Sequence, residues 1–161
     1  MNTMVVDATR KSVQMHMCAR YIAQMLAKDG KNKDYGRHLT YEKAYLGILG
    51  DEVVFIEPFL PGEFEKYVNN DGNVLDNECE IGLKAQAFVH FSYVVFDKQA
   101  LVLDVQGCNF SMTDAEIATS TITSVGNTGL FCGGNFREEG IARFFEQHTC
   151  NDYCRLLELE E

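Results

Sequence analysis

The spacing of apolar residues predicts four helices along the chain. Over residues 7–28 apolar residues recur every four positions, which is typical of an amphipathic helix, and Gly30 follows its last turn. Residues 79–96 carry an apolar stripe that fits a helix better than strict alternation, although the YVVF stretch inside it would also suit a strand. The segments 138–148 and 151–161 show the same period and predict two short C-terminal helices.

Between these helices, shorter apolar runs predict strands and turns. Residues 44–49 and 53–57 predict a hairpin, because the Gly-Asp pair between them supplies the positive φ of a tight turn. Residues 63–68 are short and amphipathic, and residues 100–107 predict a buried strand that runs into a glycine turn. Residues 119–135 are rich in Gly, Ser, Thr and Asn and predict a loop. This order of helices and strands predicts a single α+β domain without an internal repeat.

The composition narrows this picture by exclusion. Of the 161 residues, 46% are hydrophobic and two are proline, which suits a compact domain with its own core and excludes disorder and coiled coil. The 24 acidic residues outnumber the 14 basic ones and give a net charge of −10, so we expect no nucleic-acid partner. No run of about 18 apolar residues occurs and the N-terminus lacks a secretory signal, so we expect a cytoplasmic protein without a membrane segment.

A histidine and two cysteines near the C-terminus predict a metal site. The six cysteines would permit disulfides, but a chain without a secretion signal lies in a reducing compartment. His148, Cys150 and Cys154 fall within seven residues across a predicted helix boundary, and Cys150 and Cys154 are expected to share a helical face. A structural Zn²⁺ needs a fourth N or S ligand from elsewhere. Of the other histidines, at positions 16, 38 and 90, His90 lies in the apolar stretch FVHFSY. A lone histidine in such a stretch is usually a core residue, but a nearby metal site that lacks one ligand favours His90 as that ligand. We expect the cysteines at positions 18, 79, 108 and 132 to be inert thiols.

A second group of polar residues follows the strand predicted over residues 100–107. Asp104 and Gln106 are two positions apart, so their side chains can point the same way, and Asp114 lies ten residues after Asp104. Carboxylate and amide oxygens are the ligands that Mg²⁺ prefers, often together with phosphate. By spacing alone, the more common outcome is an ordinary turn in which Asp114 caps a short helix, DAEIAT.

A third group is a glycine-containing loop that enters a helix. Gly133, Gly134 and Asn135 precede the segment REEG, and free backbone N–H groups at such a position can receive an anion. The signal is weak, because Glu138 and Glu139 already suit the helix dipole.

In chain order, these segments resemble the alpha-kinase family of atypical Ser/Thr protein kinases. The resemblance extends from Val53 to the C-terminus. It rests on six segments in one order: Glu57 before PGEFEKY, then AFVHFSY, LVLDVQG, MTDAEI, GGN followed by EEGI, and FFEQHTCNDYC. Residues 7–28 also resemble the long helix of that catalytic domain.

The resemblance implies roles for the matching residues. Asp104 would be the catalytic aspartate near the acceptor hydroxyl, and Lys66 would lie near the transferred phosphate. Glu57 would lie at the hinge against the adenine of ATP, while Gln106 and Asp114 would hold Mg²⁺.

The resemblance also implies a structural zinc ion and a nucleotide-binding loop. The implied zinc ligands are His90, His148, Cys150 and Cys154, and the implied loop residues are Gly133, Gly134 and Asn135.

Two features depart from the family pattern. The nucleotide-gripping lysine and the phosphate-covering loop of the family precede its long helix, so residues 1–161 are expected to form one partial domain, the C-terminal two-thirds of an alpha-kinase domain. Arg137 stands where the family's glycine-rich loop has its last glycine, and an arginine there has less backbone freedom.

The leading hypothesis is therefore ATP-dependent phosphoryl transfer to Ser or Thr of a protein substrate. An alternative is a catalytically inactive, zinc-stabilised binding or scaffold module, which Arg137 and the absent lysine strand favour. A zinc-binding interaction domain unrelated to kinases is disfavoured, because Asp104, Gln106 and Asp114 would then be a coincidence.

Overall fold

The computed structural model describes residues 3–28, 34–75, 78–120 and 137–159. In these residues the elements are, in chain order, α1 (Thr3–Lys28), β1 (Thr40–Tyr41), β2 (Tyr45–Leu49), β3 (Glu52–Ile56), β4 (Phe64–Val68), α2 (Glu80–Val95), β5 (Ala100–Leu103), β6 (Val105–Cys108), β7 (Ser111–Thr113), β8 (Glu116–Thr119), α3 (Arg137–Gln147) and α4 (Asp152–Leu156). None of these helices is long and apolar enough to span a membrane.

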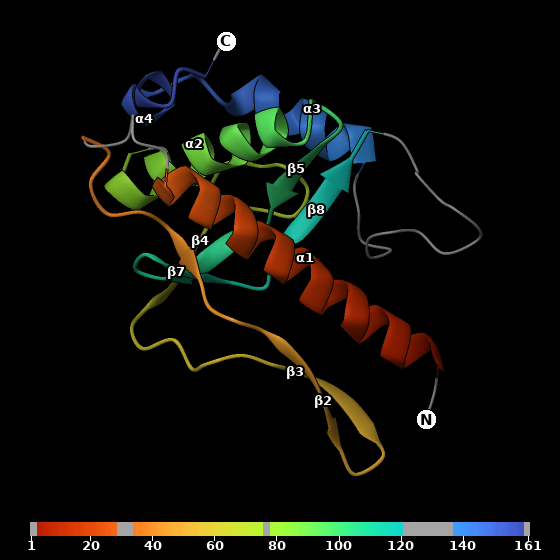
Figure 1. Ribbon diagram of the computed structural model, residues 1–161. Helices are drawn as coiled ribbons and strands as arrows, with labels where there is room; N and C mark the ends of the chain where they lie inside the picture. The colour runs from red at the N-terminus through yellow and green to blue at the C-terminus, as the bar shows by residue number, and fades with distance from the viewer. Residues whose placement is uncertain (1–2, 29–33, 76–77, 121–136, 160–161) are drawn as a thin grey trace.

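The strands form three separate sheets (Figure 1). The largest has the order β1-β7-β6-β4, with β1 parallel to β7 and the other pairs antiparallel. β5 pairs with β8, and β2 pairs with β3 in a hairpin. In the largest sheet, Gln106 lies between Lys66 of β4 and Thr113 of β7, so the strand register brings three polar residues side by side.

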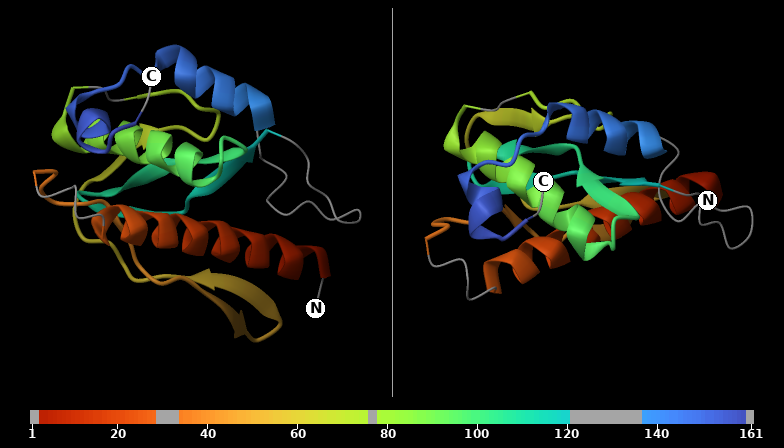
Figure 2. Two further views of the ribbon diagram at one scale, coloured as in Figure 1. Left: turned by 45° about the horizontal axis from the view of Figure 1, so that its top comes forward. Right: turned by 90° about the horizontal axis from the view of Figure 1, so that it is seen from above.

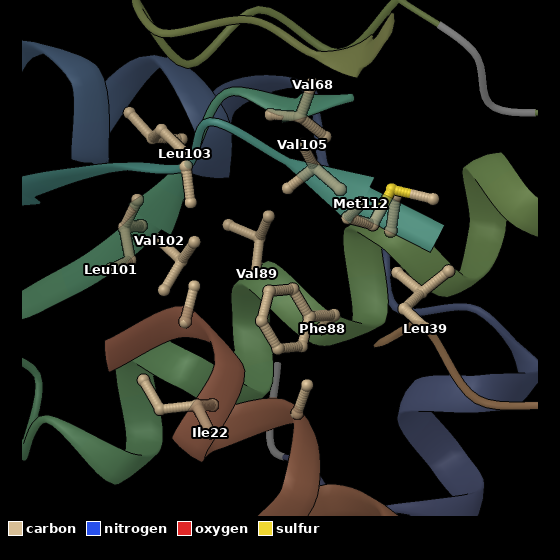
Figure 3. Packing of buried hydrophobic residues seen from close by; sticks show 14 of the residues in the cluster. Ile22, Leu39, Val68, Phe88, Val89, Leu101, Val102, Leu103, Val105 and Met112 are labelled. Atoms are coloured by element: carbon tan, nitrogen blue, oxygen red, sulfur yellow. The ribbon is translucent and has the colours of Figure 1, made fainter. Parts of the chain in front are cut away.

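The helices enclose these strands. α2 packs against β5 and β4, α3 against β8, and α1 against β1, β3 and α2. In Figure 2, α1 lies between the β2–β3 hairpin and the β5–β8 pair. Phe88 and Val89 of α2 lie in the centre of the core, where Val89 is flanked by Val102 and Met112 (Figure 3). Both α2 residues are at most 1% exposed, so α2 is the central helix of the core.

The apolar run of residues 100–107 forms two strands instead of the one that we predicted. Asp104 separates them with a left-handed φ of 56°, which is costly for a residue with a Cβ. β5 and β6 therefore join different sheets, and the carboxylate of Asp104 lies at the point where the chain passes from one to the other.

Other predictions had mixed outcomes. The helices over residues 7–28 and 79–96 and the hairpin of residues 44–57 are confirmed. A short helix at DAEIAT is wrong, because residues 116–119 pair with β5 and bury two apolar side chains as strand β8. Residues 63–68 contain strand β4. The loop predicted over residues 119–135 falls almost entirely outside the described residues.

The turn after β4 makes a close backbone contact with α3. Gly72 has a φ of 91°, and a Cβ at this position would lie 2.2 Å from the carbonyl oxygen of Gly140. Beside this contact, the guanidinium of Arg143 pairs with the carboxylate of Asp71 at 2.8 Å. Glycine at position 72 is therefore required both by the backbone conformation and by the approach of α3.

We predict that Gly72→Ala lowers the free energy of unfolding by about 3 kcal/mol, the sum of left-handed strain and overpacking against Gly140. Gly50→Ala is the matched control, because Gly50 also has a positive φ, 62°, but has open space around its Cβ direction. The control should lose only about 1 kcal/mol. Urea unfolding followed by circular dichroism measures both, and equal losses would contradict the prediction.

Candidate functional site

An ion pair joins Lys66 of β4 to Asp104, the residue directly before β6. Lys66 Nζ lies 2.5 Å from Asp104 Oδ1. The amide of Gln106 donates a hydrogen bond to Asp104 Oδ2 at 2.9 Å, and Lys66 Nζ also donates to Asn69 Oδ1 at 3.5 Å. Asp104 is 7% exposed, so the aspartate is a buried carboxylate with a fixed orientation. The family resemblance predicted Lys66, Asp104 and Gln106 in one site, and the structure brings these three side chains together.

The charge around Asp104 is unbalanced. Burial raises the pKa of Asp104 above its ordinary value of 3.8, the Lys66 ammonium lowers it, and the Asp114 carboxylate raises it again. Burial, followed by the carboxylates of Asp104 and Asp114, also raises the pKa of Glu116. Three carboxylates therefore act on one ammonium, and this surplus of negative charge favours a cation.

Glu116 is the residue of this group that the sequence did not reveal. It is the first residue of β8 and pairs with Leu103, the last residue of β5. The strand pairing therefore places Glu116 beside Asp104, which lies between β5 and β6. The interpretation of DAEIAT as a helix concealed this pairing. The segment EIAT shows no alternation, because its two central residues are both buried, so no local pattern indicated the strand.

Asp114 lies in the short connection between β7 and β8. Its φ of 49° is left-handed, as is that of Asp104, so two aspartates with unusual backbone conformations flank the β6–β7 hairpin. Gln106 supplies an amide and Asp114 a carboxylate on the same side of the fold as Asp104. This donor set consists of hard oxygen ligands and fits Mg²⁺.

Glu57 approaches the same region from the end of the hairpin. Thr113 Oγ1 donates a short hydrogen bond to Glu57 Oε1. Thr113 pairs with Gln106 in the sheet and directly precedes Asp114. The structure therefore connects Glu57 to the strands that carry the other predicted residues, although Glu57 is 57 residues away from Asp114 in the chain.

Gly133, Gly134 and Asn135 lie outside the described residues, and Arg137 is the first residue of α3. Their predicted contact with a nucleotide stays a prediction.

A second group of polar residues lies between α2, α3 and α4. Its members are His90, His148, Cys150 and Cys154, and their nearest ligand atoms all lie within 4.8 Å of one another. His148 Nε2 lies 3.3 Å from His90 Nδ1 and 3.6 Å from Cys154 Sγ, and Cys150 Sγ lies 3.6 Å from His90 Nδ1. The four side chains predicted as metal ligands therefore converge, and among the described residues they form the one group of His, Cys, Asp and Glu side chains with this geometry.

The surroundings of this group favour metal binding. Gln86 Oε1 lies 3.1 Å from His148 Nδ1, so Nδ1 carries the hydrogen and donates a hydrogen bond to Gln86. The lone pair of Nε2 is then available to a metal ion between the four side chains. Burial, followed by the neighbouring His90, lowers the pKa of His148 to about 4, which keeps the imidazole neutral. Burial raises the pKa of Cys154 to about 12, so a thiolate there needs a nearby cation such as a metal ion.

One detail of this group differs from the prediction. Cys150 and Cys154 do not share a helical face, because Asn151 is the N-cap of α4 and Cys150 precedes it. The side chain of Asn151 accepts hydrogen bonds from the N–H groups of Tyr153 and Cys154 and so fixes the start of this short helix. Among the described residues, the cysteines at positions 18, 79 and 108 lie outside the group, as expected, while Cys132 is not described.

Comparison with known proteins places the chain in a family. The family model for the alpha-kinase family matches residues 2–154. The chain therefore belongs to the alpha-kinase family.

Its curated relatives are kinases and a channel. The chain is 40% identical over 105 residues to myosin heavy chain kinase A of Dictyostelium discoideum, covering 65% of this chain and 8% of that protein. It is 36% identical over 110 residues to human eukaryotic elongation factor 2 kinase, covering 68% and 14%. It is 28% identical over 163 residues to human transient receptor potential cation channel subfamily M member 6, covering 94% and 8%. The chain thus spans a small part of each relative.

Solved structures give the same assignment for the fold. The alpha-kinase domain of myosin heavy chain kinase A in complex with ADP matches all of this chain with a TM-score of 0.80 and 30% identity, and the match covers 62% of that domain's chain. The complex of the same domain with AMP-PNP matches with a TM-score of 0.79 and 30% identity, covering 95% of this chain and 58% of that one. The fold is therefore the mixed α and β fold of these domains.

We predict that Glu116→Gln changes how stability depends on pH. The folded-state pKa of Glu116 is raised, so the folded protein holds a proton above pH 4.5 that the unfolded chain has lost, and stability falls as pH rises through this window. Between pH 4.5 and neutral pH, the free energy of unfolding should therefore fall less in the variant than in the unmodified chain. Urea unfolding at a series of pH values measures this, with the exposed Glu52→Gln as the matched control. The same pH dependence in Glu116→Gln as in the unmodified chain would contradict the raised pKa of Glu116.

Proposed function

We propose that this chain is part of a protein kinase that transfers the γ-phosphoryl group of ATP to Ser or Thr of a protein. The observation that carries this proposal is the buried Asp104 carboxylate, held by Lys66 and Gln106, in a member of the alpha-kinase family. In phosphoryl transfer, most of the catalysis comes from positioning and from neutralisation of charge. An oriented carboxylate beside an ammonium suits both tasks.

In this proposal Asp104 orients the acceptor hydroxyl and accepts its proton. Burial already raises the pKa of Asp104, which brings the carboxylate closer to the basicity that a general base requires. Lys66, whose ammonium now pairs with Asp104, would lie near the transferred phosphoryl group and stabilise its charge.

Nucleotide and Mg²⁺ would bind around the same strands. Gln106 and Asp114 would hold Mg²⁺, which neutralises phosphate charge when bound, and the negative surplus around Asp104 supports a cation there. Glu57 would contact adenine, and the loop of Gly133, Gly134 and Asn135 would contact the phosphates. The complexes of myosin heavy chain kinase A with ADP and AMP-PNP support a nucleotide site in this fold.

The group of His90, His148, Cys150 and Cys154 would hold a structural zinc ion. Zn–N bonds of about 2.05 Å and Zn–S bonds of about 2.3 Å in a tetrahedron place two nitrogens about 3.3 Å apart, and a nitrogen and a sulfur about 3.6 Å apart. The separations of 3.3 Å between His90 and His148, and of 3.6 Å from each cysteine to a histidine, support this assignment. An ion bound there would link α2 to the segment that carries α4.

We also propose that residues 1–161 form one partial alpha-kinase domain. The chain covers 62% of the solved domain's chain. Its β2–β3 hairpin also leaves large apolar side chains exposed, including Ile48 at 64% and Leu49 at 70%. A hairpin with such exposure lacks the packing that strands normally need, and further strands of a complete domain would supply it.

We predict that the purified chain carries one zinc ion and that Cys154→Ala loses it, together with about 3 kcal/mol or more of unfolding free energy, because the site contributes folding energy directly. Native mass spectrometry gives the stoichiometry and urea unfolding gives the stability. Cys18→Ala is the matched control, because Cys18 lies on α1 outside the group. A zinc content that is equal in Cys154→Ala and the control would contradict the assignment.

We predict that Asp104→Asn lowers the rate of phosphoryl transfer by about 100-fold or more, the usual contribution of a general base, while nucleotide affinity changes little. Transfer from radiolabelled ATP to a generic Ser/Thr protein substrate measures the rate, and calorimetry with AMP-PNP and Mg²⁺ measures the affinity. Asp97→Asn is the matched control, because Asp97 is an exposed aspartate with a similar left-handed φ of 52°.

The same assay separates kinase activity from the alternative of a binding module. Equal transfer by Asp104→Asn and Asp97→Asn would show that Asp104 is not the catalytic aspartate. If the unmodified chain transfers no phosphate and binds no nucleotide, the zinc-stabilised scaffold becomes the better description of it.

A further inference from the structure

A buried histidine on α1 directly faces Glu57. His16 is 1% exposed and its ring packs edge-on against Tyr41 and Phe55, with centroid separations of 5.5 and 5.6 Å. Its Nδ1 lies 3.9 Å from Glu57 Oε2. No role for His16 follows from the proposed chemistry, yet a buried imidazole needs partners for both ring nitrogens.

The first ring nitrogen fixes the tautomer. His16 Nε2 lies 2.8 Å from the carbonyl oxygen of Glu42, which only accepts hydrogen bonds, so Nε2 carries a hydrogen. In the neutral ring, Nδ1 then holds a lone pair that points toward a carboxylate. Nδ1 is buried and has no hydrogen-bond donor among the described residues.

A second proton resolves this conflict. An imidazolium donates from Nδ1, and a shortening of the present 3.9 Å separation by about 1 Å would give a charge-assisted hydrogen bond to Glu57. The two oxygens of Glu57 would then have separate partners, because Oε1 already accepts from Thr113. The carboxylate would be held between α1 and β7.

We infer that His16 is a positioning residue that, in its protonated form, holds the Glu57 carboxylate in a fixed orientation. His16 does not reach the reacting atoms, and it acts through Glu57. The inference rests on the proposed function in one respect only, the contact of Glu57 with adenine.

Among the described residues, the titratable groups around this imidazole come from α1, β1 and the end of β3. Glu57 approaches from the end of β3 and Tyr41 from β1. Glu42, after β1, meets the ring with its carbonyl, and Arg20, one turn after His16 on α1, donates to the carbonyl of Tyr41. Burial, followed by the charge of Asp104, raises the pKa of Tyr41, so its hydroxyl stays neutral near neutral pH. The carboxylate of Glu57 is therefore the group that responds to the proton on His16.

The test follows the Glu57 carboxyl carbon and the ring nitrogens of His16 by NMR in the whole chain, over the pH range in which the chain stays folded. The carboxyl resonance, assigned with Glu57→Gln, should show a step at the same pH as the ring nitrogens of His16. The step should vanish in His16→Phe, which keeps an aromatic ring against Tyr41 and Phe55. His38→Phe is the matched control, because His38 stacks on Tyr35 instead, and it should keep the step.

The functional arm measures the affinity for adenosine, which carries no phosphate that titrates in this range. Affinity should weaken by about 3- to 10-fold as pH rises through the step, the worth of one hydrogen bond, and should be independent of pH in His16→Phe. The sign follows from the proton, because the imidazolium that holds Glu57 exists on the acidic side of the step.

Three results would overturn the inference: a Glu57 resonance without a step, a step that persists in His16→Phe, or a step without any pH dependence of adenosine affinity. Failure of the proposed function looks different. If adenosine does not bind at any pH, the adenine role of Glu57 is wrong, and the carboxyl resonance alone decides whether His16 holds Glu57.

Discussion

The left-handed backbone at Asp104 is the constraint on which the rest of the site depends. It costs about 1–2 kcal/mol for a residue with a Cβ, and it divides one apolar run into β5 and β6. Because β5 pairs with β8 and β6 pairs with β4, the same break brings Glu116 and Lys66 to Asp104 from opposite directions. A continuous strand would pair all its residues in one sheet, so residues 100–108 could not pair with β8 in one sheet and with β4 in another.

Helix α2 connects this site to the group of His90, His148, Cys150 and Cys154. Val89 of α2 faces the strands, while His90, the next residue, faces the C-terminal segment. Gln86, one turn earlier on the same side as His90, accepts from His148. On the opposite side of the group, Asn151 caps α4 and donates to the carbonyl of Leu83, so α4 is tied to α2 by polar contacts as well. A five-residue helix such as α4 is too short to be stable alone, which explains why these ties are needed.

The sequence predicted the elements that are defined by local periodicity. α1, α2 and the β2–β3 hairpin have apolar spacing and turn residues that act within the element itself, so these predictions hold. The strands β1, β7 and β8 have two to four residues each. β1 and β8 pair with strands that are not their neighbours in the chain, as with Thr40 and Ser111. No local pattern marks so short a strand, and tertiary pairing overrode the helical propensity of DAEIAT.

The candidate sites show the same division. His148, Cys150 and Cys154 lie within seven residues, so their grouping was visible in the sequence, whereas Glu116 joined its site only through strand pairing. His16 was indistinguishable from any other residue on the buried stripe of a helix. What makes it distinctive is the carbonyl of Glu42 on one side and the carboxylate of Glu57 on the other, and both contacts belong to the assembled fold.

The polar residues of the site are thus stabilised less by one another than by the surrounding core. Asp104 and Glu116 both have raised pKa values, which means that the folded state disfavours their charges despite the ammonium of Lys66. The core around Phe88, Val89 and Leu103 offsets this unfavourable electrostatic contribution. In the proposed kinase, Mg²⁺ bound near Asp114 would bring positive charge to these carboxylates. The buried negative charge that lowers the stability of the fold would then favour the binding of metal and nucleotide. Burial is the first cause of both raised pKa values, repulsion between the carboxylates is the second, and the same buried negative charge suits the proposed catalytic role.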